Sequence, residues 1–157
     1  MRWAFMPAYL NTLNFSQQEL AARRGWALTR AALIEMRDAS SRIGAEFVVM
    51  FLPFKEQIHL PLLDAAMPRP ELTRAVKFSL DDLGGKADVS AMLRNRLAQN
   101  NLMRVFCADA GIRFADMTPI LDARVRQGEN VYFPDESHLN ETGHAIVADA
   151  LRNFLNR

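Results

Sequence analysis

Six consecutive apolar residues, 47–52 (FVVMFL), constrain the fold of this chain more than any other feature. Most of them are β-branched or aromatic, and Gly44 and Pro53 bound the run. A strand with no polar position has no side suited to water, so both of its faces need cover, as in parallel sheets flanked by helices. The run therefore predicts a buried strand in a parallel α/β sheet.

A long helix is predicted before this strand. The Ser16 hydroxyl can accept from the Glu19 amide while the Glu19 carboxylate reaches back to the Ser16 amide, which is the capping box that begins a helix. We expect the helix to continue to about Ile43 and to end at Gly44 in a left-handed conformation. A helix, a short turn and a buried strand make half of a β–α–β unit.

The rest of the chain alternates helices, turns and one more strand. The predicted elements are a helix at 55–63, a turn-rich stretch at 64–89 with one short helix after Pro70, a helix from a Ser90 cap to about Ala110 closed by Gly111, a strand at 112–117, a helix opened by Thr118 as N-cap and Pro119 and ended by Gly128, a loop at 129–140, a helix from about Asn140, and a further strand at 3–6.

Length and composition fit one globular domain spanning residues 1–157. The chain is 50% apolar and 24% charged, which permits a substantial core, and its net charge of +1 gives no reason to expect a nucleic-acid partner. The single cysteine, Cys107, excludes a disulfide framework within the chain. The N-terminal apolar stretch is too short and broken for a signal peptide, and no run approaches the ~20 residues of a membrane span. The chain as written is therefore expected to be cytoplasmic, whereas a longer parent protein is open to export.

The loop before the last helix carries the candidate chemistry. Asp135 and His138 lie three residues apart in the stretch YFPDESHLNETGH. This spacing lets the carboxylate accept from the imidazole Nδ1–H and stabilise an imidazolium, which leaves Nε2 as a general base. The same spacing also suits a surface ion pair at the entry of a helix, and the two interpretations remain open on spacing alone.

Three segments together resemble the SGNH/GDSL hydrolase family. Residues 135–144 (DESHLNETGH), followed by an amphipathic helix, resemble its last conserved block, and residues 47–57 (FVVMFLPFKEQ) and 111–119 (GIRFADMTP) are similar to segments of a branch related to alginate O-acetyltransferases. The resemblance covers about residues 43–156. It implies a three-layer, flavodoxin-like fold and serine-dependent attack on an ester or acetyl group of a small molecule or carbohydrate. Asp135 matches the triad aspartate of the family and His138 its histidine.

The chain departs from this family at the nucleophile. The Gly-Asp-Ser block and the oxyanion-hole glycine and asparagine are missing, and no serine of the chain follows an aspartate at a strand-to-helix elbow. Two hypotheses follow. The first is an ester hydrolase or O-acetyl-handling enzyme whose serine is not in this chain, and the second is a truncated, inactive domain that acts as a binding or assembly module. Loss of the first strands of the family would leave an unpaired apolar sheet edge, which predicts a homodimer, or aggregation, through that edge or the apolar surface beside it.

Lys55 and Glu56 follow the predicted buried strand, where ligand sites of parallel sheets lie. They either line a substrate cleft or form the solvated first turn of a helix, and the solvated turn is the commoner case. A metal site at Asp135, His138 and His144 lacks recognised ligand spacing. We therefore expect no metal and no cofactor.

Overall fold

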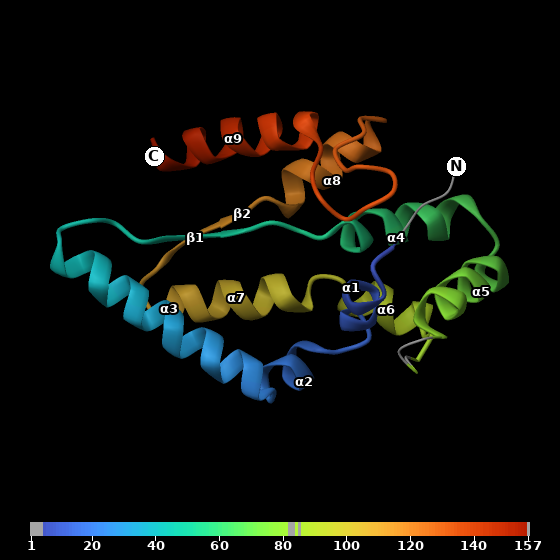
Figure 1. Cartoon of the computed structure of the whole chain (residues 1–157), viewed down its shortest axis with the longest axis horizontal. Coiled ribbons are helices and arrows are strands. Elements are labelled where there is room, and N and C mark those ends of the chain that lie inside the picture. Colours follow the sequence, from blue (N-terminus) through green and yellow to red (C-terminus); the bar gives the residue numbers. More distant parts are fainter. Residues whose placement is uncertain (1–4, 82–83, 85, 157) are drawn as a thin grey trace.

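The computed structural model describes residues 5–81, 84 and 86–156, and within them the chain is a mixed α/β protein that is mostly helical (Figure 1). The elements are α1 (Pro7–Thr12), α2 (Gln17–Ala21), α3 (Arg24–Arg42), β1 (Val48–Phe51), α4 (Lys55–Ala66), α5 (Arg69–Leu80), α6 (Val89–Asn95), α7 (Ala98–Asp109), β2 (Arg113–Asp116), α8 (Thr118–Arg126) and α9 (Glu141–Leu155). No helix of this part of the chain has the length and apolar character to cross a bilayer.

The two predicted strands form a parallel pair. β1 and β2 run in register from Val48 opposite Arg113 to Phe51 opposite Asp116. Helices α8 and α9 lie on one side of the pair, and α7 and α3 lie on the other (Figure 1). The α/β class and the parallel direction are confirmed, and the sheet of the described residues has two strands.

The extent of the sheet differs from expectation in two respects. Residues 3 and 4 of the predicted N-terminal strand lie outside the described residues, and Phe5 and Met6 are not in a strand. The expectation that residues 47–52 are buried on both faces is wrong, because β1 is only half-buried and Met50 is exposed. An apolar run shows that both faces of a strand are suited to burial. Whether they are buried depends on which helices or strands pack against them.

The predicted helix from Ser16 to Ile43 is broken in the structure. The capping box forms, but it opens the five-residue helix α2, and a new helix begins at Arg24. Arg23 has extended backbone between them, and its guanidinium lies 3.7 Å from the centre of the Phe15 ring. Gly44 ends α3 with φ +70°, as predicted. The break turns the chain so that Leu20 of α2 is buried, which a continuous pattern along the sequence does not show.

Two other predicted helix starts are displaced. The Asp88 carboxylate, and not Ser90, caps α6 by accepting from the Ala91 amide at 2.9 Å. Residues 96 and 97 separate α6 from α7, so the single predicted helix is two. Thr118 is the first residue of α8 and not its cap, since its hydroxyl accepts from the side-chain amide of Asn100 at 2.6 Å.

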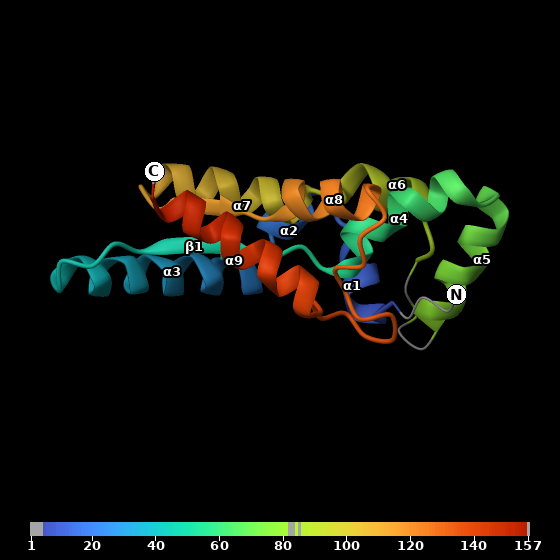
Figure 2. The ribbon, with the colours of Figure 1, turned by 90° about the horizontal axis from the view of Figure 1, so that it is seen from above.

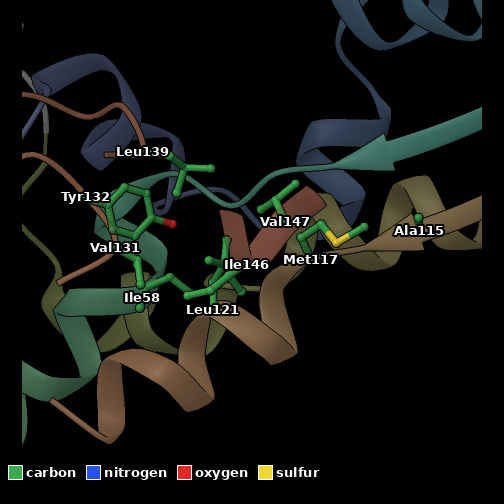
Figure 3. Close-up of a cluster of buried hydrophobic side chains, with 9 residues drawn as sticks. All are labelled: Ile58, Ala115, Met117, Leu121, Val131, Tyr132, Leu139, Ile146 and Val147. Atoms are coloured by element: carbon green, nitrogen blue, oxygen red, sulfur yellow. The ribbon is translucent and has the colours of Figure 1, made fainter. Parts of the chain in front are cut away.

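Three clusters of buried apolar side chains hold these elements together. One lies among α1, α4, α5 and α6, and another lies between α7 and the strands, with part of α3 against it. The third joins α4, β2, α8 and α9 to the loop that precedes α9, and Figure 3 shows Val131, Tyr132 and Leu139 of this loop beside Ile58 and Ile146. The loop with the candidate chemistry is thus rooted in the core at both of its ends.

Candidate active site

The loop at 131–140 is a closed turn whose ends are paired and whose tip is exposed. Tyr132 and Leu139 form an antiparallel bridge, in which the Phe133 amide donates to the His138 carbonyl at 3.0 Å. The Tyr132 hydroxyl donates to the Pro53 carbonyl at 2.9 Å, directly after β1. These contacts place the tip, residues 133–138, at the carboxyl end of β1, where side chains after parallel strands converge.

Lys55 binds the backbone of the tip through its buried ammonium group. Its ammonium is fully buried, and it donates hydrogen bonds to the carbonyl oxygens of Phe133, Pro134 and Glu136 at 2.8, 2.8 and 3.1 Å. Burial lowers the pKa of Lys55, while the carboxylates of Glu56, Asp135 and Glu136 favour its charged form. The three carbonyl acceptors match the three N–H donors of the ammonium. These hydrogen bonds offset the cost of burying the charge, and they fix the geometry of the loop.

Glu56 is buried beside the same loop. Its Oε1 accepts from the Met6 amide at 2.6 Å, and burial raises the pKa of its carboxyl, against the opposing effects of that amide and of the Lys55 ammonium. The hydroxyl of Ser137 lies near enough to favour the charged carboxylate, although the geometry is not that of a hydrogen bond, and both Glu56 Oε2 and Ser137 Oγ are buried without a hydrogen-bond partner. The expectation that Lys55 and Glu56 form a solvated helical turn is therefore wrong.

We predict that Glu56→Gln removes a pH dependence of stability. The pKa of Glu56 is raised above 4.5 in the folded chain, so between 4.5 and the folded value the native state retains a proton that the unfolded state has lost. The free energy of unfolding of the wild-type chain should therefore fall as pH rises through this window, relative to Glu56→Gln, and the two should run parallel below it. Urea unfolding of both proteins from pH 4 to 8 measures the difference, and Glu71→Gln on the exposed start of α5 is the control. Parallel curves throughout would contradict the prediction.

His138 is exposed at the tip, with its side chain 80% accessible. Its Nδ1 lies 3.3 Å from Oε2 of Glu136, which is itself half exposed. The structure thus brings a carboxylate to Nδ1, as the spacing suggested, but the carboxylate is that of Glu136 and not that of Asp135. The Asp135 carboxylate instead acts on the Lys55 ammonium, whose charged form it favours. With Nδ1 beside Glu136 and the side chain exposed, Nε2 is left to accept a proton.

A second polar group, which the sequence interpretation missed, connects the ends of the two strands. The side-chain amide of Gln57 donates to Asn100 Oδ1 at 2.8 Å, and the Asn100 amide donates to the Asp116 carboxylate at 3.1 and 3.2 Å and to the Thr118 hydroxyl. Arg104 also contacts Asp116 at 2.8 Å, beside a cavity of about 320 Å³. The position of these residues in the sequence could have indicated the group, because Gln57 follows the first strand and Asp116 ends the second.

The remaining candidates have structural roles. His59 is buried, with Nδ1 3.0 Å from the Lys55 carbonyl oxygen, and burial lowers its pKa. Cys107 is buried and burial raises the pKa of its thiol, which disfavours a reactive thiolate. His144 is exposed in the first turn of α9. Within the described ranges no three His, Cys, Asp or Glu side chains are grouped as a metal would require.

No described serine hydroxyl is hydrogen-bonded to His138. Ser16 caps α2, Ser79 donates to the Ala75 carbonyl within α5, and Ser90 accepts from Arg69. Ser137 adjoins His138 in sequence, but its hydroxyl is buried on the side of Glu56. The arrangement can thus remove or supply a proton at the loop tip, and the described part of the chain does not place a nucleophile beside it.

Comparison of this chain with family models, with curated proteins and with solved structures found no match.

Proposed function

We propose that the tip at 133–138 is the general-base half of an SGNH-type ester hydrolase or O-acetyl transferase. His138 is the base, and the serine nucleophile comes from a polypeptide segment outside residues 1–157. The observation that carries the proposal is the buried Lys55 ammonium with its three carbonyl acceptors. Burying a charge to hold an exposed turn is costly, and a fixed base is what proton transfer requires. The resemblance of residues 135–144 to the last block of that family supports the same assignment.

The proposed reaction proceeds by acyl transfer. His138 Nε2 takes the proton of the serine hydroxyl as its oxygen attacks the acyl carbon, and a carboxylate at Nδ1 stabilises the imidazolium. The ester alcohol then leaves with that proton. Water, or the hydroxyl of an acceptor, attacks the acyl-serine with its own proton passing to His138, which returns the serine and the base. The proposed substrates are acetylated carbohydrates or small acyl esters.

The proposal includes the finer architecture. Two parallel strands with helices on both sides fit part of a three-layer, flavodoxin-like sheet. In such sheets, ligands bind beyond the carboxyl ends of the strands. The loop tip, Lys55 and the Gln57–Asp116 group all lie at those ends, which supports a reaction site there.

In the purified chain, which lacks the serine, His138 can still act as general base on water, and we predict that the slow hydrolysis of p-nitrophenyl acetate by this route depends on His138. His138→Ala should lower the rate roughly 10²-fold, the lower end of general-base contributions. His144→Ala is the matched control, because it removes a second exposed histidine from the adjoining helix and should leave the rate unchanged. Glu136→Gln and Asp135→Asn, compared in one assay, identify which carboxylate orients the imidazole.

Two results would contradict this proposal. Equal rates for the wild-type chain and His138→Ala would exclude the base, and labelling of any serine of the chain by a fluorophosphonate probe would exclude an external nucleophile. Circular dichroism of each variant shows whether the fold is kept. The exposure of His138 leads us to expect no loss of structure.

The second candidate is an inactive assembly module, and the exposed surface described below favours it. The same assay separates the two candidates. A module without turnover shows no His138-dependent rate, whereas its association with a partner is unaffected by His138→Ala.

A further inference from the structure

The chain exposes more surface than its size requires. Its accessible surface is 9437 Å² for a mass of 17.8 kDa, whereas folded monomers of this mass expose roughly 8,000 Å². The excess, about 1,400 Å², exceeds the ~800 Å² per partner of a standard protein interface and is typical of an obligate dimer. An excess of this size is expected of a protomer that buries a stable interface on association.

One edge of the two-stranded sheet is open. The Phe51 carbonyl accepts from the Met117 amide, so in the parallel register Val49 and Phe51 direct their backbone groups toward β2. The backbone groups of Val48 and Met50, and of Leu52 if the extended chain continues, then point to the other side. No described element pairs with that side. Met50 and Leu52 are also exposed, which leaves an apolar edge open to a further strand.

Helix α3 also exposes apolar side chains. It is 19 residues long, and none of them is buried. Leu28, Met36 and Ile43 are 60%, 53% and 81% exposed. α3 and α7 cover the same face of the strand pair, but in the view from above α3 lies next to β1 and α7 lies at the opposite edge of the molecule (Figure 2). We call the open edge, together with the exposed apolar residues of the neighbouring helix, the β1–α3 surface (Leu28, Met36, Ile43, Met50 and Leu52).

We propose that the β1–α3 surface binds a second copy of this chain about a two-fold axis. The axis passes beside Met50, so that Met50 faces the Met50 of the other copy and Val48 faces its Leu52 in antiparallel pairing. Residues 48, 50 and 52 alternate in the same way on both strands, so each outward N–H meets a carbonyl of the other copy. The result is a continuous four-stranded sheet, and the same rotation brings both α3 helices to the interface.

The sharpest test is a disulfide across the axis. Residues of a hydrogen-bonded antiparallel pair have Cα atoms about 5.5 Å apart, within disulfide range. Met50→Cys should therefore give a covalent dimer on mild oxidation. Phe78→Cys on α5, which is 86% exposed and outside the β1–α3 surface, is the matched control and should give none. The native Cys107 is fully buried and should not crosslink in the wild-type chain.

Sedimentation equilibrium of the full chain is the second measurement. The wild type and Phe78→Ser should sediment as dimers. Met50→Pro removes one outward N–H without removing a bond to β2, and should shift the equilibrium to monomer by at least tenfold. Met36→Lys, at a half-exposed position of α3, should act in the same direction without affecting the fold. A monomer at every concentration, equal crosslinking of the two cysteine variants, or larger oligomers that Met50→Pro leaves unchanged would overturn the proposal.

Discussion

Lys55→Met is expected to lower the free energy of unfolding by about 3–5 kcal/mol, the cost typical of removing one partner of a buried charged group. Methionine fills a similar volume but has no donor. The carbonyls of Phe133, Pro134 and Glu136 would lose their shared partner, and the buried Glu56 side chain would lose the favourable charge of the Lys55 ammonium. Burial of the methionine side chain recovers only part of this loss.

Urea unfolding monitored by circular dichroism measures the change, with Lys77→Met as the control. Lys77 lies on the exposed face of α5, and its replacement should change the stability by less than about 0.5 kcal/mol. Hydrogen exchange gives a local readout, because amides at 133–138 should lose protection before those of α7. Equal unfolding midpoints for the two methionine variants would show that Lys55 does not hold the loop.

Gly143→Ala is expected to destabilise the chain by about 3 kcal/mol, at the upper end of overpacking effects. Gly143 is buried in the first turn of α9, where its amide donates to Asn140 Oδ1 at 3.0 Å. A Cβ at this position would overlap the Val131 carbonyl oxygen and would lie 2.9 Å from a Leu139 methyl group. The backbone of the loop cannot yield easily, because the Asn140 amide is bonded to that same carbonyl.

Gly25→Ala is the matched control and has the opposite sign. Gly25 lies in α3 with no atom within 4 Å of a built Cβ, so alanine should raise the stability by about 0.5–1 kcal/mol through helix propensity. Both variants are compared by denaturant midpoint at constant m value. A neutral Gly143→Ala would mean that the loop and α9 separate readily, so that the loop would not hold His138 in a fixed position.

Much of the architecture follows from local sequence. The strands at 47–52 and 112–117, the glycine stops at 44, 111 and 128, and the Asn140 start of the last helix are visible because apolar runs, caps and left-handed glycines act over a few residues. The breaks at Arg23 and at residues 96–97 were missed. They depend on which face of each helix finds a packing partner, and a periodic pattern does not carry that information.

Part of the candidate site could also be predicted from local sequence, and part could not. The motif D-x-x-H placed the loop and its histidine, and the position after a strand drew attention to Lys55 and Glu56. The carboxylate at Nδ1 proved to be Glu136, because the backbone path of the loop tip sets which side chain reaches the imidazole. The catalytic role of Asp135 and His138 stays a prediction.

The sequence by itself determined the order of helices and strands, the parallel α/β class and the position of the loop, since these depend on neighbouring residues. Only the tertiary structure decided that Lys55 is buried under the loop and not solvated, and that β1 has an open edge. Both depend on contacts between segments far apart in the chain, such as Lys55 with Glu136 and β1 with β2. Burial of an ammonium is stable only where three carbonyls converge on it, and no pattern within one segment of the sequence specifies that convergence.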